Sequence, residues 1–279
     1  MKTGLTVVLV PLSCLVLGAG AALAEFPEGV PDTVQVDMGG TFASLDTNLG
    51  VIPSDGGVGV VANLEEVMNL DTSQSAWRID GNWRFTKRQH LDFGYVNYDR
   101  SGSRESRETF TWGDYTFNKG NTMDGSFDSS FIYAAYRYDF LQDPHVRISG
   151  SAGVSYVDLS ASMSGTGTVG TPDGPRTGTF TADASMSVPV PLFGLQLDWA
   201  MAKKWELMWY GRFMFVNQSF EGSVYDSTLR VKWWFLKNVG AGLGYDRQDI
   251  TIRSYEKDDK DLKGNYNIAG WSAFLSLAF

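Results

Sequence analysis

The sequence has little cysteine, little histidine and no excess of basic residues, and an abundance of any of the three would indicate a familiar class of protein. Only one of its 279 residues is cysteine and two are histidine, and 23 Lys and Arg residues face 32 Asp and Glu residues. The acidic excess argues against a nucleic-acid binder, which needs a basic surface. Beyond residue 24 no run of 18 uninterrupted apolar residues occurs, so we expect no membrane-spanning helix in that part. A soluble β-rich domain and a membrane β-barrel remain.

Residues 1–24 have the three-part pattern of a secretory signal peptide. Lys2 precedes an apolar stretch that ends in the small residues Ala22-Leu23-Ala24, directly before Glu25. A membrane-anchoring helix is the alternative, but the end of the stretch is weakly apolar and no basic cluster follows it. We expect export with cleavage near Ala24, which leaves residues 25–279 as one domain. Cleavage removes Cys14, the only cysteine, so an extensive hydrogen-bonded framework must replace disulfides.

Apolar and polar residues alternate along the rest of the chain with a period of two, as they do in β-strands. In the final stretch, Trp271, Leu275 and Phe279 alternate with Ser272 and Ser276. Stretches of this kind occur at 34–39, 77–85, 90–95, 132–140, 146–156, 193–199, 205–215, 225–235, 239–246 and 269–279. A strand of a soluble sandwich would show the same period. Large aromatic residues on one face and full charges on the other favour a transmembrane barrel.

The connections between these stretches alternate between short and long. Tight turns are expected at 86–89, 142–144, 202–204 and 237–238, whereas the segments 46–74, 101–125, 160–180, 219–223 and 253–264 read mostly as longer polar loops. Short periplasmic turns and long outward loops are typical of bacterial outer-membrane barrels. We therefore predict an all-β, antiparallel, up-and-down transmembrane β-barrel of ten strands. Eight or twelve strands are alternatives, because the first loop could hide a hairpin near Val58–Val61.

Two segments resemble known proteins. The ending Trp271-Ser-Ala-Phe-Leu-Ser-Leu-Ala-Phe279 resembles the carboxy-terminal signature of Gram-negative outer-membrane proteins. This resemblance implies a place in the cell outer membrane among its lipids and lipopolysaccharide, and recognition of the last strand by the barrel-assembly machinery. Residues 60–100, with Trp77-Arg-Ile-Asp-Gly-Asn-Trp-Arg-Phe85, resemble small proteobacterial outer-membrane proteins of unassigned activity.

The polar faces of the stretches should line the barrel interior with a balanced set of charges. These residues are Asp37, Arg78, Asp80, Arg84, Asp92, Arg137, Asp139, Arg147, Asp198, Glu206, Arg212, Arg230, Lys232 and Asp246. Interior charges away from water are tolerated when they are paired and hydrogen-bonded. In a narrow barrel such a set predicts a structural plug. A narrow hydrated conduit is the alternative, and we expect no large water-filled pore.

The sequence gives little support for an enzyme. Barrel enzymes of this membrane place catalytic residues near the outward rim: Asp and His in the omptin proteases, Ser and His in the lipid A deacylases. Here His90 and His145 each follow an expected periplasmic turn, so we interpret both as turn-flanking, interfacial residues. No catalytic motif such as HExxH or GxSxG is present. We predict no catalytic, metal or cofactor site.

Segment 60–71 is a candidate lid over the outer mouth of the barrel. Leu64, Val67 and Met68 have the spacing of one apolar helical face, and simple loop packing is the alternative. The whole pattern predicts a non-enzymatic outer-membrane barrel with a structural or narrow-channel transport role. A barrel enzyme acting on lipid A or peptides and a surface adhesion module with long outer loops are the rival functions.

Overall fold

The computed structural model describes residues 26, 30, 33–53, 60–63, 65–66, 70–105, 109–112, 115–171, 174–217, 220–255 and 260–279. The expected signal peptide lies outside these residues. No helix within them is long and apolar enough to cross a membrane.

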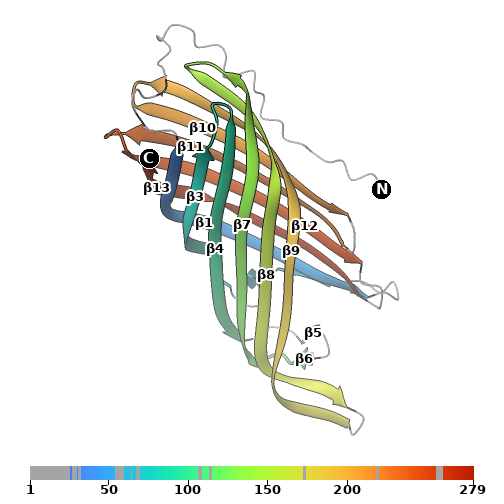
Figure 1. Cartoon of the computed structure of the whole chain (residues 1–279). Helices are drawn as coiled ribbons and strands as arrows, with labels where there is room; N and C mark the ends of the chain where they lie inside the picture. Colours follow the sequence, from blue (N-terminus) through green and yellow to red (C-terminus); the bar gives the residue numbers. More distant parts are fainter. Residues whose placement is uncertain are drawn as a thin grey trace, which may run out of the picture.

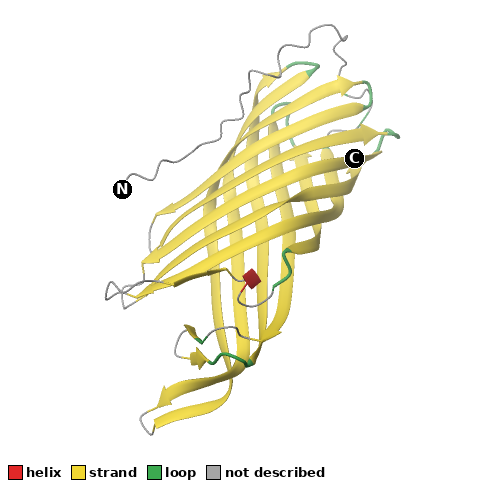
Figure 2. Cartoon of the chain, turned by 180° about the vertical axis from the view of Figure 1, so that it is seen from behind, coloured by secondary structure: helices red, strands yellow, loops and turns green. Residues whose placement is uncertain are grey.

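Ten antiparallel strands form one closed barrel (Figures 1 and 2). They are β1 (Val34–Pro53), β3 (Ser73–Arg84), β4 (Gln89–Glu105), β7 (Thr122–Gln142), β8 (Val146–Thr171), β9 (Gly174–Ala202), β10 (Trp205–Asn217), β11 (Phe220–Trp234), β12 (Val239–Tyr255) and β13 (Lys260–Ala278). Each wall strand pairs with its neighbours in chain order, and β13 pairs with β1 to close the ring. The predicted ten-stranded barrel is confirmed.

Three short strands stand outside this ring. Among the described residues, the strand β2 (Val60–Asn63) pairs with β1 alone, while β5 (Phe110–Trp112) and β6 (Tyr115–Phe117) form a small hairpin whose β6 strand pairs with β8. The strand-like region near residue 60 is therefore real, but it adds no wall strand. The four expected tight turns all join consecutive wall strands at one end of the barrel, at the top of Figure 1.

The two ends of the chain close the wall. The β1–β13 ladder runs from Gln35 opposite Ala278 to Pro53 opposite Lys260. Phe279 extends it, since its N–H donates to Val34 O at 2.8 Å and its carbonyl accepts from Val34 N at 3.0 Å. Closure of this kind satisfies the backbone donors and acceptors that a sheet edge would leave unpaired in lipid.

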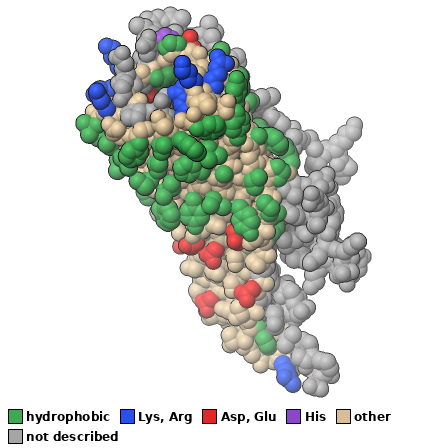
Figure 3. Space-filling view, viewed as in Figure 1, with side chains coloured by type: hydrophobic (Ala, Val, Ile, Leu, Met, Phe, Trp, Pro, Cys, Tyr) green, Lys and Arg blue, Asp and Glu red, His purple; other side chains and the backbone are tan. Residues whose placement is uncertain are grey.

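A belt of exposed apolar side chains surrounds the half of the barrel nearest the tight turns. Trp271 is 65 % exposed, Leu243 64 %, and Phe42 60 %. Figure 3 shows this belt on one face, with Lys and Arg side chains at the turn end and acidic side chains beyond the opposite border. Such exposure is costly in water and favourable against lipid acyl chains. The belt is the membrane-spanning zone, and the turn end is the periplasmic end.

Beyond the belt the same strands continue, but their apolar face changes sides. Along β7 the outward residues pass from Ile132 and Phe140 in the belt to Asp128 beyond it, while the buried inward residues pass from Arg137 to Phe127. Side chains keep alternating between outward and inward along β7, so the apolar residues change from even-numbered to odd-numbered positions. The physical reason is the solvent: lipid surrounds the belt and water surrounds the extension.

The strands extend into most of the segments that were predicted as outer loops, and that prediction is wrong. Residues 46–53, 101–105 and 122–125 are parts of β1, β4 and β7, and 160–171 with 174–180 form the outer part of the long β8–β9 hairpin. Strand β11 begins at 220, and β12 and β13 enclose only 256–259. The polar outward face of these segments made them read as loops. They are strands whose outer surface meets water.

One pair of outward carboxyls on this extension gives a pH-dependent prediction. Asp99 and Asp128 lie directly opposite each other on β4 and β7. Partial burial and the Asp99 charge raise the pKa of Asp128 above its ordinary value. A carboxyl with a raised pKa in the folded state makes that state less stable as pH rises through the pKa. Asp128→Asn should therefore raise the urea midpoint of unfolding at neutral pH and change it little near about pH 3. A lowered midpoint at neutral pH would contradict this.

Candidate functional site in the barrel lumen

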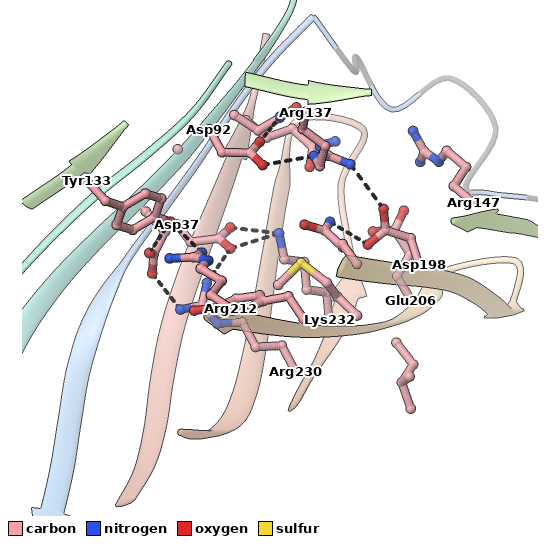
Figure 4. Close-up of a pocket in the computed structure, with 18 residues that line it drawn as sticks. Asp37, Asp92, Tyr133, Arg137, Arg147, Asp198, Glu206, Arg212, Arg230 and Lys232 are labelled. Atoms are coloured by element: carbon pink, nitrogen blue, oxygen red, sulfur yellow. Dashed lines mark hydrogen bonds and ion pairs between the residues drawn. The ribbon is translucent and has the colours of Figure 1, made fainter. Parts of the chain in front are cut away.

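Five buried or half-buried charged side chains form one connected layer inside the belt, and Figure 4 labels three of them, Asp37, Arg230 and Lys232. Arg230 on β11 donates to Asp37 Oδ2 on β1 at 3.3 Å and to Asp80 Oδ2 on β3 at 2.5 Å. Lys232 Nζ lies 2.8 Å from Asp37 Oδ2. Arg78 Nε donates to Asp80 Oδ2 at 2.7 Å. These ion pairs join strands across the lumen. Each buried charge has a partner of opposite charge, which offsets the free-energy cost of its burial.

Two tyrosines and a further arginine carry the layer to the opposite wall. Tyr133 on β7 donates to Asp80 Oδ1 at 3.0 Å, and Arg78 Nη2 donates to the Tyr210 hydroxyl on β10 at 2.7 Å. The Arg212 Cζ atom lies 3.9 Å from the centroids of both tyrosine rings. Its Nη2 donates to the Tyr133 hydroxyl at 2.9 Å. Cation–π contacts and hydrogen bonds thus hold Arg212 between the rings.

Asp246 joins strand β12 to the same layer. Its Oδ1 accepts from Arg78 Nη1 at 2.9 Å and from the Thr228 hydroxyl at 2.7 Å. The layer therefore links β1, β3, β7, β10, β11 and β12. Side chains from opposite walls meet at this level of the lumen.

A second cluster lies nearer the periplasmic end. Arg137 Nε donates to Asp92 Oδ2 at 2.9 Å, and Arg137 Nη1 is 3.5 Å from Asp198 Oδ2. His90 Nε2 lies 3.0 Å from Asp139 Oδ2, and both side chains are almost fully buried. The interpretation of His90 as an interfacial residue is wrong. It follows a turn, as predicted, but its position on β4 has inward parity and places it in the lumen.

Three other predicted lumen residues stand at the periplasmic mouth. Arg84 donates to the carbonyls of Thr86 at 3.2 Å and Lys87 at 2.7 Å, so it braces its own turn. Arg147 lies under the ring of Phe26, with its Cζ 4.0 Å from the centroid. Glu206 and Arg147 line the cavity at this end (Figure 4). The predicted set thus divides into a connected layer, a periplasmic cluster and a mouth.

The prediction omitted several lumen residues, namely Tyr98, Arg100, Tyr133, Tyr210, Asp226 and Tyr266. Tyr133 shares the inward parity of Arg137 on β7, and Arg100 shares that of Asp92 on β4. Parity would have placed both inside. The predicted set contained charged residues alone, so it left out Tyr133, and the expected strand ended at 95, before Arg100.

A group of charged and polar contacts lies inside the extension, next to the rings of Phe127 and Tyr266. Arg100, which is 2 % exposed, donates through Nη1 to Glu65 Oε1 at 2.5 Å and through Nη2 to the Thr47 hydroxyl at 2.5 Å. Glu65 Oε2 accepts from Thr47 N at 3.0 Å. The guanidinium also faces the rings of Phe127 and Tyr266, at 5.0 and 5.5 Å from their centroids. We call Glu65, Arg100 and Thr47 the outer latch.

The latch comes from the segment predicted as a lid. Glu65 and Glu66 form a helical turn, visible as the small red element in Figure 2. Asn63 Oδ1 accepts from Glu66 N at 2.9 Å, which is an N-cap contact. The residues expected to form its apolar face, Leu64, Val67 and Met68, lie outside the described residues. The described contacts that hold this turn over the lumen are therefore an ion pair and hydrogen bonds.

Two hollows lie on either side of the charge layer. The lower hollow, about 760 Å³ with its open space, faces the periplasmic cluster, and the upper hollow, about 510 Å³ with its open space, faces the extension. Asp80, Tyr133 and Arg212 line both. These three side chains separate the hollows.

Above the upper hollow the lumen is filled by apolar side chains. Phe127, Met163 and Ile250 are each 3 % exposed or less and belong to one buried cluster. These residues lie beyond the stretches whose polar faces were predicted to line the interior. Among the described residues, no group of three or more His, Cys, Asp or Glu side chains is placed to hold a metal ion.

The comparisons with known proteins agree with this architecture. The chain is similar to the outer membrane protease OmpT from Escherichia coli, with 13 % identity and a TM-score of 0.54 over 89 % of this chain and 97 % of that one. The chain folds as an outer-membrane β-barrel. The translocator domain of the autotransporter NalP from Neisseria meningitidis aligns over 86 % of this chain and 88 % of that one, with 14 % identity and a TM-score of 0.44. No family model and no curated protein matches the sequence. Identity this low shows a fold and no activity.

Proposed function

We propose that the protein is a non-enzymatic, occluded outer-membrane barrel whose primary role is structural: it anchors a stiff β-extension outside the membrane. The observation that carries this proposal is the charge layer centred on Arg230, Asp80 and Arg78, which ties strands from opposite walls together. Apolar packing and the outer latch add two further barriers above it.

Energetics supports a closed lumen. Opening a path requires separation of buried ion pairs, and breaking one buried pair typically costs about 3–5 kcal/mol. The layer holds several pairs that share partners, because Asp80 accepts from Arg78, Arg230 and Tyr133. No single side chain can leave without exposing the charges of its partners.

Narrow-channel transport is the second candidate. The observation that favours it is that the same three residues, Asp80, Tyr133 and Arg212, line both hollows. A movement of Tyr133 and Arg212 would join the hollows into a thin polar path. Such a path would suit single small solutes rather than bulk flow.

Single-channel recording in planar bilayers tests the proposal. We expect the purified barrel to show no stable conductance steps. The double variant Tyr133→Ala/Arg212→Ala should produce small steps if the layer is the main barrier. Tyr133→Phe, which keeps the ring, is the matched control and should stay closed. Large, stable, porin-like steps from the unaltered protein would overturn the occluded barrel.

Three expectations from the sequence belong to this proposal. Residues 1–24 would direct export and be cleaved off near Ala24, the belt would contact outer-membrane lipids and lipopolysaccharide, and the barrel-assembly machinery would recognise the strand that ends at Phe279. The rival enzymatic role is less well supported because His90 is enclosed by Asp139 and Arg137 near the periplasmic end, far from the outward rim. An adhesion role would use the outer surface of the same extension.

A further inference from the structure

Two neighbouring turns at the periplasmic end of the barrel carry three lysines. Lys203 and Lys204 lie in the turn between β9 and β10, and Lys237 lies in the turn between β11 and β12. Trp234 N donates to Lys204 O at 2.9 Å, which joins the first turn to the end of β11. All three lysine side chains are exposed, at the end of the molecule where Figure 3 shows Lys and Arg side chains. We call Lys203, Lys204 and Lys237 the lysine corner.

Apolar side chains of the belt adjoin the lysine corner. Trp205 follows Lys204 directly, and its ring stacks on the ring of Trp233, with the centroids 6.0 Å apart and the planes 20° from parallel. Trp205 is 44 % exposed and Trp233 is 43 % exposed. Leu236, which precedes Lys237, is 60 % exposed. Tryptophan in membrane proteins favours the depth of the lipid headgroups, so the lysine corner stands at that depth.

The positive charge of the lysine corner is not neutralised by the chain around it. Residues 199–205 and 233–238 contain no Asp or Glu. Glu206 follows Trp205, but it lines the lower hollow inside the barrel. Within the part of the chain that the structure describes, the three ammonium groups have no ion-pair partner. In a protein with a formal net charge of −9, the corner is a local excess of positive charge.

The turn between β3 and β4 is also basic, but its surroundings differ. It carries Lys87 and Arg88, and it is joined to the end of β7 because Asp139 N donates to Arg88 O at 2.9 Å. The turn that follows β7 carries Asp143, whose side chain is exposed. Two cations there adjoin a turn with a carboxylate, whereas the lysine corner has three cations and no carboxylate in its own two turns. The β3–β4 turn therefore serves as a matched control.

We propose that the lysine corner binds the headgroup of an anionic phospholipid of the inner leaflet, such as phosphatidylglycerol. The ammonium groups would contact the lipid phosphate, and the acyl chains would lie along Trp205, Trp233 and Leu236. Each Lys or Arg near an anionic lipid surface adds to the attraction. The long lysine stem lies along apolar surface while its charge reaches the headgroups. The proposal goes beyond the structural role, and it depends on the position of the belt in the membrane rather than on a closed lumen.

Other partners fit this surface less well. An acidic protein or a cell-wall polymer could supply negative charge from the periplasm, but neither would use the apolar surface of Trp205, Trp233 and Leu236. A zwitterionic phospholipid offers the same phosphate and the same chains, but the lysines would repel its cationic group. The phosphates of lipopolysaccharide belong to the outer leaflet, at the opposite border of the belt. The net charge of the headgroup therefore decides binding.

Native mass spectrometry of the full barrel, kept in a nonionic detergent until ionisation, tests this. The probes are phosphatidylglycerol and phosphatidylcholine with identical acyl chains, which differ in headgroup charge. We expect the first phosphatidylglycerol molecule to bind at least tenfold more tightly than the first phosphatidylcholine molecule. Equal affinity for the two lipids would overturn the proposal. This comparison uses the unaltered protein, so it decides the question even if a variant does not fold.

Paired substitutions locate the site. Lys204→Gln/Lys237→Gln removes one charge from each turn and keeps long polar side chains, so it should reduce the preference for phosphatidylglycerol at least fivefold. Lys87→Gln/Arg88→Gln removes the same number of charges from the β3–β4 turn and should reduce the preference less than twofold. Equal reductions in the two variants would show a diffuse basic ring without a site at the lysine corner, and would refute the assignment.

Cosedimentation with purified peptidoglycan tests the rival partner. We expect no binding to peptidoglycan that depends on the lysine corner. Binding that Lys204→Gln/Lys237→Gln abolishes, together with equal affinity for the two lipids, would assign the corner to the cell wall and overturn the proposal. Conductance tests the closed lumen and lipid binding tests the turn end, so the structural proposal and this one fail separately.

Discussion

Arg230→Met should lower the free energy of unfolding by about 3–5 kcal/mol, the usual cost of removing one partner of a buried ion pair. Arg230 is 2 % exposed and donates to both Asp37 and Asp80. Methionine fills a similar volume without a charge. Asp37 would keep Lys232, and Asp80 would keep Arg78 and Tyr133, so the barrel should still fold.

Equilibrium urea unfolding of the refolded barrel in detergent micelles measures this loss. The matched control is Arg247→Met, because Arg247 pairs with Asp249 on the outer surface and its side chain is 61 % exposed. An exposed ion pair contributes about 0–1 kcal/mol, so the control should change little. Equal losses of unfolding free energy in Arg230→Met and Arg247→Met would show that burial of the Arg230 ion pairs adds nothing to stability.

Adding Asp80→Asn to Arg230→Met gives a further check on the mechanism. In the double variant, position 80 has no charge that would need the Arg230 guanidinium, although Arg78 loses its ion pair with Asp80. We expect the double variant to lose less stability than the sum of the two single losses. Additive losses would mean that the two residues do not act through their contact.

The second large effect is expected at the outer latch. Glu65→Gln keeps the shape of the side chain but removes the charge that faces Arg100 at 2.5 Å. The buried guanidinium would then retain the Thr47 hydroxyl and the two aromatic rings as partners. We expect the helical turn to leave the lumen often, because local opening follows the loss of the contact that holds a segment.

Cysteine labelling measures this opening. A chain that starts at residue 25 contains no cysteine, so Ile268→Cys introduces a single thiol. Ile268 is 3 % exposed and lines the upper hollow. A small water-soluble thiol reagent should label it at least tenfold faster when Glu65→Gln is also present.

Glu66→Gln is the control for the latch. Glu66 is exposed, and its carbonyl rather than its side chain accepts from Arg104. This neighbouring change should leave the labelling rate at the level of the Ile268→Cys chain alone. If Glu65→Gln labels no faster than Glu66→Gln, the ion pair does not hold the lumen closed.

Much of the barrel could be predicted from the sequence because lipid imposes a simple rule on each strand. Trp271, Leu275 and Leu243 face outward since no other surface in the belt can accept them, and their exposure follows the predicted parity. The opposite parity placed Asp37, Arg137 and Arg230 inside. Strand number followed from counting stretches between turns, which is local information.

The outer half was harder to predict, for a reason that lies in the environment. Alternation gives two faces but does not say which of them meets solvent. Inside the belt the apolar face is outward, and in the extension the residues of β8 such as Met163 turn inward while Ser162 and Ser164 face out. Only the height of the membrane along the barrel decides where the change occurs.

By itself, the sequence determined which side chains point outward within the belt, how many strands close the wall, and that the interior charges must balance. The tertiary structure alone decided which charges meet. Arg230 reaches Asp80 across 150 positions of sequence, and Arg100 reaches Glu65 across 35. The physical reason is that parity acts within a single strand, whereas partners across a lumen are chosen by the closure and stagger of the whole cylinder.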